Sequence, residues 1–268
     1  MKAKAIVQSM LGLFDMALIR RSSLEKINQH LAAVDDIELL KMLPAAHAEN
    51  LINHLNNSKS QFRQDLFVLS QLNFKKNGYF VEFGATNGID LSNTHLLEKQ
   101  FAWTGILAEP ARCWHNDLEL NRSAVIEHDC VWKDSNSILT FNEADFPELS
   151  TINRYSNNDS HGWRRKRGKK YDVKSISLND LLEKYHAPKI IDYLSIDTEG
   201  SEYDILSSFN FEKYTIRVIT CEHNYTTMRT KIFGLLSEKG YTRKFVSLSK
   251  VDDWYVKESD ISLIPPIG

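Results

Sequence analysis

The chain contains 268 residues, with 33 Lys and Arg against 35 Asp and Glu, so its formal net charge is −2 with neutral histidines. Hydrophobic residues make up 42% of the chain and aromatic residues 10%, which excludes a wholly disordered protein. Eleven glycines and six prolines exclude a collagen-like or low-complexity architecture. The length and composition are typical of a globular enzyme or binding domain, with room for an extension.

The three cysteines, Cys113, Cys130 and Cys221, are too scattered for a disulfide framework or a paired zinc site. They indicate a reducing compartment, so we expect a cytoplasmic protein. No apolar run reaches the roughly 18 residues that a membrane-spanning helix needs.

The first segment, residues 5–19, is mostly apolar and is flanked by basic residues. Arg20 and Arg21 follow it where a signal peptide would have a small-residue cleavage site, so we expect no secretion. Gln8 and Asp15 favour an amphipathic helix packed on its own domain. The alternative is an interfacial helix, which would give peripheral contact with the inner face of a membrane.

The chain up to residue 60 carries helical patterns only. Pro44 interrupts them, and a turn-rich stretch at residues 56–60 marks a composition change. We therefore predict a helical extension over 1–60, a main domain over 61–257 and a tail over 258–268. Apolar residues recur at helical spacing in the extension: Leu24, Ile27, Leu31 and Val34.

The main domain alternates between short apolar runs and helical patterns, which predicts an α/β fold with a mostly parallel sheet covered on both faces. The expected strands are 79–83, 104–108, 124–128, 190–196, 215–221, 241–246 and 251–256. The expected helices are 92–101, 112–120, 178–185, 202–209 and 226–239. Only residues 247–250 separate the last two strands, so these two should pair antiparallel.

A glycine turn follows the first expected strand. Gly84 and Gly88 let the backbone turn tightly and approach a ligand, although a structural turn is the alternative. The turn has neither the GxGxxG pattern of dinucleotide sites nor the GK[ST] of phosphate loops. Glu82 disfavours a pyrophosphate at this strand end and suits an ammonium or a sulfonium.

Acidic residues end the next two strands. Glu109 lies 25 residues after Gly84, close to the offset at which related folds hold ribose hydroxyls with a carboxylate. Asp129 ends the third strand and could accept a hydrogen bond from an adenine amino group, with a turn or helix cap as the alternative.

The densest cluster of acids is Asp197, Glu199 and Glu202 after the fourth strand. Three carboxylates within six residues are costly to hold together unless a cation, a proton or hydrogen-bond donors compensate them, which indicates a functional site rather than a polar turn. His223, at the end of the fifth strand, lies at the same sheet edge and is a candidate general base.

Taken in order, these motifs resemble the FkbM-type methyltransferases, a family of the class I, S-adenosylmethionine-dependent superfamily. The resemblance covers roughly residues 60–257, and the motifs that carry it are Ser60-Gln61 with Gln64-Asp65, Glu82 to Gly88, Ser92-Asn93-Thr94, Glu109-Pro110, Asp197 to Gly200 with Glu202, and Glu222-His223. It implies a Rossmann-like, seven-stranded sheet with one antiparallel strand. It also implies O-methylation of a hydroxyl on a sugar, a polyketide or a related small molecule.

The resemblance implies residue roles as well. Glu82, Gly84 and Gly88 would hold the methionine part of the cofactor, Glu109 the ribose and Asp129 the adenine, while Asp197 and Glu199 would face the methyl group and the acceptor. The remaining cofactor contacts that we expect are Thr86, Asn87 and Asn93. The first motif departs from the family pattern, because it begins with Glu82 rather than Asp and reads Ala85-Thr86-Asn87.

Methyl transfer to oxygen requires a base that removes the proton of the acceptor hydroxyl. We favour His223 as that base, with Asp197 as the other candidate. A divalent metal held by Asp197, Glu199 and His223 is an alternative way to acidify the hydroxyl, but the spacing does not demand it.

Residues 161–171 contain six basic residues and no acidic one. We expect an insertion that overhangs the cofactor cleft and contacts an anionic substrate or a membrane surface; a solvated loop is the alternative, and no RNA-binding signature supports nucleic acid. The substrate contacts that we expect are Arg164, Arg165, Arg167 and Glu222.

The sequence therefore predicts an S-adenosylmethionine-dependent O-methyltransferase for a sugar hydroxyl in a surface glycan or its precursor, hence a role in polysaccharide biosynthesis. A binding module without catalytic activity, which engages a membrane or partner through residues 161–171, is the alternative. A nicotinamide dehydrogenase is disfavoured by the absence of GxGxxG and by Glu82.

Overall fold

The computed structural model describes residues 21–261. The chain divides into two compact units between Met42 and Leu43. The first unit contains the helix α2 (Arg21–Lys41), and Pro44 precedes the helix α3 (Ala45–Ile52) of the second unit. The predicted amphipathic segment at residues 5–19 lies outside the described residues. Within residues 21–261, no helix is both long enough and apolar enough to cross a membrane.

The second unit is built on a seven-stranded sheet in which only β11 runs against its neighbours. This confirms the predicted Rossmann-like fold and the antiparallel pairing of the last two strands. In spatial order the strands are β10 (Thr242–Lys244), β11 (Asp252–Val256), β9 (Thr215–Glu222), β8 (Ile190–Ile196), β1 (Tyr79–Phe83), β2 (Thr104–Ala108) and β3 (Val125–Glu127).

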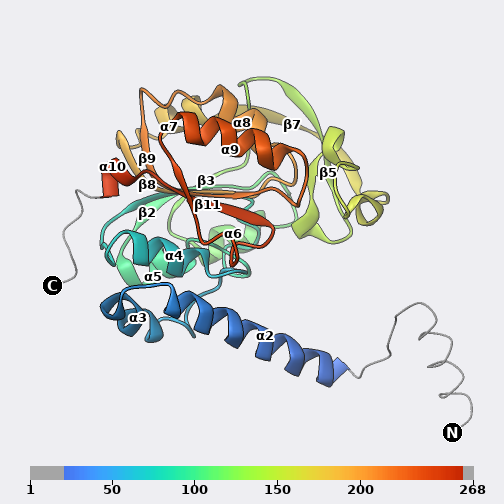
Figure 1. Cartoon of the computed structure of the whole chain (residues 1–268). Helices are drawn as coiled ribbons and strands as arrows, with labels where there is room; N and C mark the ends of the chain where they lie inside the picture. Colours follow the sequence, from blue (N-terminus) through green and yellow to red (C-terminus); the bar gives the residue numbers. More distant parts are fainter. Residues whose placement is uncertain (1–20, 262–268) are drawn as a thin grey trace, which may run out of the picture. The chain divides into compact units, whose positions relative to one another are not determined.

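Helices cover both faces of this sheet (Figure 1). One face carries α4 (Gln64–Gln71), α5 (His95–Phe101) and α6 (His115–Asn121), and the other carries α7 (Leu178–Lys184), α8 (Glu202–Ser208) and α9 (Met228–Glu238). Val81 and Phe83 pack into the buried core with α7, α8 and α9. Phe80, which precedes Val81 in β1, lies under the guanidinium of Arg122 instead, as the alternation of a strand requires. The short helix α10 (Glu258–Ile261) follows β11.

The order of the strands reverses between β8 and β1. From β1 the chain moves outward through β2 to β3, whereas β8 and β9 lie on the other side of β1. In open parallel sheets, ligands bind beyond the carboxyl ends of the strands at this switch point. The residues that follow β1 and β8 therefore belong to one candidate site.

Several elements are shorter than predicted, and two of these differences have a clear local reason. The helix expected from residue 92 begins at His95, because Ser92 and Thr94 donate their hydroxyl groups to Glu82. The strand expected over 241–246 ends at Lys244, because Phe245 has a φ of 49°, which breaks extended backbone.

A second sheet of four strands replaces the loop expected between the third and fourth strands. Its order is β4 (Cys130–Trp132), β7 (Lys169–Ser177), β5 (Ile138–Glu143) and β6 (Thr151–Ile152). Three 3₁₀ turns accompany it: η1 (Pro147–Leu149), η2 (Asn153–Tyr155) and η3 (Gly162–Arg165). The end of the basic run, residues 169–171, is thus part of β7, and Figure 1 shows β5 and β7 beside one end of the main sheet.

Arg122 organises the turn that follows β1. Its side chain is fully buried and pairs with Glu98 at 2.9 Å between Nε and Oε2. It also donates to the carbonyl of Gly88 at 3.1 Å and to the hydroxyl groups of Ser92 and Thr94 at 3.0 and 2.8 Å. One buried guanidinium thereby fixes the whole loop that carries the predicted cofactor contacts.

Replacing this arginine tests that role. We expect Arg122→Met to lower the free energy of unfolding by about 3–5 kcal/mol, because it leaves Glu98 and several polar groups buried without a partner. The matched control is Arg154→Met, an exposed arginine over the ring of Trp132, which should cost less than about 1 kcal/mol. Urea unfolding measures both, and equal losses would contradict the assignment.

Candidate active site

A cavity lies at the switch point and encloses about 890 Å³, including its part open to solvent. It is large enough for a cofactor-sized ligand. Its walls come from the ends of β1, β2 and β8, from α4 and the residues just before it, and from the second sheet. They include Gln61, Gln64, Glu82, Gly84, Thr86, Asn93, Glu109, Cys130, Val131, Phe141, Pro147, Glu148, Asp197, Thr198 and Glu199.

At Gly84, the backbone after β1 lies directly against the backbone after β8. Its φ is +77°, and a Cβ there would lie 2.2 Å from the carbonyl oxygen of Asp197. Only glycine combines this backbone conformation with this approach. The predicted glycine turn therefore brings the end of β1 against the end of β8.

Glu82 is buried and lines the cavity, and it accepts hydrogen bonds from the next loop. Asn93 N donates to its Oε1 at 2.7 Å, and Ser92 Oγ to its Oε2 at 3.1 Å. Burial raises the pKa of Glu82, and the Arg122 guanidinium opposes that rise. Asn93 also lines the cavity and donates from Nδ2 to Ser195 Oγ at 2.9 Å, while its buried Oδ1 has no partner among the described residues.

Glu109 connects the turn after β1 with the end of β2. Its Oε2 accepts from the backbone N–H of Thr86 at 2.9 Å, and its Oε1 from that of Ala111 at 2.8 Å. Burial, with the nearby charges of Asp197 and Glu143, raises the pKa of Glu109 to about 7. Glu109 and Thr86, both expected as cofactor contacts, line the cavity.

Three of the predicted cofactor contacts, Asn87, Gly88 and Asp129, are not among the residues that line the cavity. Asn87 uses its Oδ1 to accept from the backbone of Ile89 and Asp90, and so shapes the turn. Gly88 packs under Arg122. Asp129 lies in the turn between β3 and β4, where its N–H donates to Glu127. The next two residues, Cys130 and Val131, form that wall of the cavity instead.

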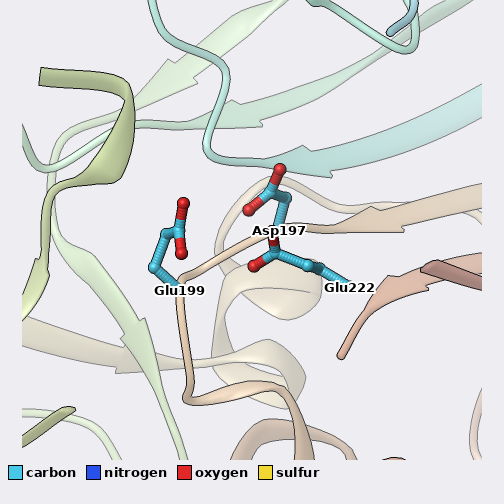
Figure 2. A group of neighbouring side chains, drawn as sticks. All are labelled: Asp197, Glu199 and Glu222. Carbon is cyan, nitrogen blue, oxygen red and sulfur yellow. The ribbon is translucent and has the colours of Figure 1, made fainter. Parts of the chain in front are cut away.

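Three carboxylates meet where β8 and β9 end, one of them from the last residue of β9. Oxygen atoms of Asp197, Glu199 and Glu222 all lie within 4.8 Å of one another, and Figure 2 shows the three side chains turned toward a common point. Burial raises the pKa of Asp197 to about 7, with a further contribution from Glu202. Burial and the charges of Asp197 and Glu199 raise the pKa of Glu222.

Glu202, the remaining acid of the motif, holds the loop in place. Its Oε1 accepts from the backbone N–H groups of Thr198 and Gly200, both at 3.0 Å, and from the hydroxyl of Thr198 at 2.8 Å. These donors satisfy the carboxylate at the start of α8. Its role is therefore structural, whereas Asp197 and Glu199 line the cavity.

Arg165 supplies the positive charge at this cluster. Burial raises the pKa of Glu199, and Arg165 opposes that rise through a 2.6 Å ion pair from Nη2 to Oε2. The guanidinium also pairs with Asp159 at 2.8 Å and donates to the carbonyl of Leu149 at 2.7 Å. Arg165, which the sequence suggested as a substrate contact, is thus a buried internal cation, whereas Arg167 is exposed.

His223 is not among the residues that line the cavity. Its Nδ1 accepts from the N–H of Tyr225 at 3.0 Å, and its Nε2 is 3.7 Å from Oδ1 of Asp253. Burial lowers its pKa. The acids brought together are Asp197, Glu199 and Glu222, so Glu222 stands where the sequence interpretation had placed His223 in a metal-binding trio.

The arrangement can do two things chemically. A group of carboxylates that shares one cation is a favourable environment for a further positive charge, such as a sulfonium or a divalent metal. A carboxylate with a pKa of about 7 can also accept a proton at neutral pH, and Asp197 is such a group beside the cavity. Sequence patterns did not identify Arg122 and Arg165 as organising cations, because each arginine meets its partners only in the folded chain.

Comparison with known proteins matches residues 82–243 to the family described as Methyltransferase FkbM domain. No curated protein matches the chain significantly. The matched stretch is more than half of the chain and includes the cavity residues Glu82, Glu109 and Asp197. It also includes the whole carboxylate cluster. The protein belongs to the FkbM methyltransferase domain family.

Proposed function

We propose that the protein transfers a methyl group from S-adenosylmethionine to a hydroxyl of a sugar in a surface glycan or its precursor, on the cytoplasmic side. The observation that carries the proposal is the acidic cavity at the switch point of the sheet, lined by Glu82, Glu109 and Asp197. Family membership supports methyl transfer, and the acidic walls support a cationic methyl donor.

The residues present fit such a cofactor. Each carboxylate oxygen of Glu109 has two lone pairs and accepts one hydrogen bond from a backbone N–H. Each oxygen can therefore accept a further hydrogen bond, for example from a ribose hydroxyl. The unpartnered Oδ1 of Asn93 and the carboxylate of Glu82 suit the amino-acid part. Cys130 and Val131 offer an apolar wall for the adenine. S-adenosylmethionine supplies the methyl group when it is bound.

Asp197 takes the role of base. It lines the cavity, and its pKa of about 7 lets it remove a proton from a hydroxyl at neutral pH. Glu222 interacts with Asp197 through a hydrogen bond that stabilises the ionised form of Asp197. Glu199, held by Arg165, fixes the loop and faces the acceptor side of the cavity.

Cofactor binding should depend on pH. Asp197 and Glu109 ionise as the pH rises through about 7, so affinity for the sulfonium of S-adenosylmethionine should increase from pH 6 to pH 8. S-adenosylhomocysteine has the same adenosine and amino acid but a neutral thioether, which makes it the matched control. We expect calorimetry to show the ratio of the two affinities rising about three- to tenfold, in favour of S-adenosylmethionine.

An affinity ratio that stays constant across this pH range would contradict the electrostatic role of the cavity. Failure of both ligands to bind at millimolar concentration would contradict the proposed function itself.

Asp197→Asn tests the base. We expect methyl incorporation from labelled S-adenosylmethionine into a glycan-precursor extract to fall at least about 100-fold, while cofactor affinity stays within about tenfold. His223→Gln is the control, and it should keep incorporation within about threefold because His223 does not line the cavity. The reverse result, with His223→Gln inactive and Asp197→Asn active, would return the role of base to the histidine.

Removing divalent metal ions tests whether the carboxylates bind a metal. Arg165 and the raised pKa values already compensate the charge of the cluster, so we expect EDTA to leave methyl incorporation within about twofold. Loss of activity that Mg²⁺ restores would instead assign Asp197, Glu199 and Glu222 as metal ligands.

A further inference from the structure

Two exposed aromatic rings flank an arginine beside the cavity. Phe146 is 48% exposed and Trp163 is 64% exposed. The guanidinium carbon of Arg164 lies 5.3 Å from the ring centroid of Phe146 and 5.0 Å from that of Trp163. We call Phe146, Trp163 and Arg164 the rim platform. Phe146 lies between β5 and η1, and Trp163 and Arg164 lie in η3, so all three belong to the segments that connect β5 to β7. Figure 1 labels these two strands.

The rim platform is tied to the cavity from both sides. Phe146 is followed directly by Pro147 and Glu148, which line the cavity. Arg164 is followed by Arg165, whose guanidinium holds the cavity residue Glu199 at 2.6 Å. Consecutive Cα atoms are about 3.8 Å apart, so the platform lies within a few residue lengths of the cavity wall on each side.

Arg164 has hydrogen-bonding capacity to spare. Across residues 21–261, its side chain forms neither an ion pair nor a hydrogen bond, and its buried Nε has no partner. A guanidinium that contacts aromatic rings keeps its N–H edge free for a carboxylate or a phosphate. Lys166 and Arg167, which lie further along the chain, are exposed cations, while Asp145 and Glu148 flank Phe146 in the sequence.

We propose that the rim platform binds the methyl acceptor, and that the acceptor is a saccharide whose ring carries a carboxylate or a phosphate. The inference rests on the proposed function and adds the class of substrate. Exposed aromatic faces grouped beside a cavity mark a ligand surface, and the C–H face of a sugar ring packs on such a ring. The anionic group then pairs with the N–H edge of Arg164.

A glycan microarray tests this proposal with neutral, carboxylated and phosphorylated members of the same saccharides. The wild-type protein, saturated with S-adenosylhomocysteine, should bind at least one anionic class at least tenfold more strongly than its neutral counterparts. Trp163→Ala and Arg164→Gln should each lower that signal at least tenfold. Which anionic class binds distinguishes a uronate-type acid from a sugar phosphate.

The chain offers a matched control. Phe233 is 38% exposed on α9 and lies 4.4 Å from the guanidinium of Arg243, so it reproduces an exposed ring with an arginine away from the cavity residues. Phe233→Ala should keep the glycan signal within twofold. Calorimetry on the same preparations should show that none of the three variants changes the affinity for S-adenosylmethionine more than twofold.

Several results would overturn the inference. These are binding to neutral glycans only, no binding to any anionic glycan, or an unchanged signal with Trp163→Ala. Displacement of the glycan by single-stranded RNA at lower concentration would also overturn it, because bases stack on exposed aromatic rings as well. If S-adenosylmethionine binds in these cases, only the acceptor class fails; if it does not bind, the proposed function fails too.

Discussion

Buried negative charge at the ends of β8 and β9 is the constraint that shapes this part of the protein. Buried carboxylates must be matched by protons, by hydrogen-bond donors or by cations. All three are present: Asp197 has a pKa of about 7, Glu202 accepts from two backbone N–H groups, and Arg165 pairs with Glu199. The loop after β8 therefore depends on the second sheet, which brings Arg165.

Two buried arginines hold two different segments of the cavity wall in place. Arg122 holds the turn after β1, where Glu82 and Asn93 line the cavity. Arg165 holds the loop after β8 and ties it to the second sheet. The proposed contacts to the amino-acid part of the cofactor, Glu82 and Asn93, belong to the first segment, and the proposed acceptor contacts belong to the second. Changes near Arg165 can therefore alter the acceptor contacts while Glu82 and Asn93 stay in place.

The sequence predicted the buried parallel strands better than any other feature. Residues 79–83, 104–108 and 190–196 are strands with the expected bounds, because strands buried on both faces appear as short apolar runs that end at turn residues. The second sheet was missed. In β7 charged residues alternate with Tyr171 and Val173, and β6 has only two residues, so neither resembles a buried strand.

The site was predicted in part for a similar reason. The ordered motifs brought Glu82, Gly84, Glu109 and Asp197 to one cavity, because the carboxyl ends of parallel strands share an edge. They could not show which way His223 points. Successive side chains at a strand end point to opposite faces, so when Glu222 meets Asp197 the next residue turns toward Asp253.

The position of Asp197 suggests how the charge of the cavity stays balanced. A cationic ligand favours the ionised carboxylate, and a neutral ligand favours the protonated acid, since a buried group with a pKa near 7 changes state at small cost. When positive charge leaves the cavity, Asp197 becomes a better proton acceptor at the same moment. In the proposed reaction, the proton of the acceptor hydroxyl can then replace the lost charge. A cluster of carboxylates that Arg165 pairs only in part suits this exchange better than a fully paired cluster, whose charge could not change.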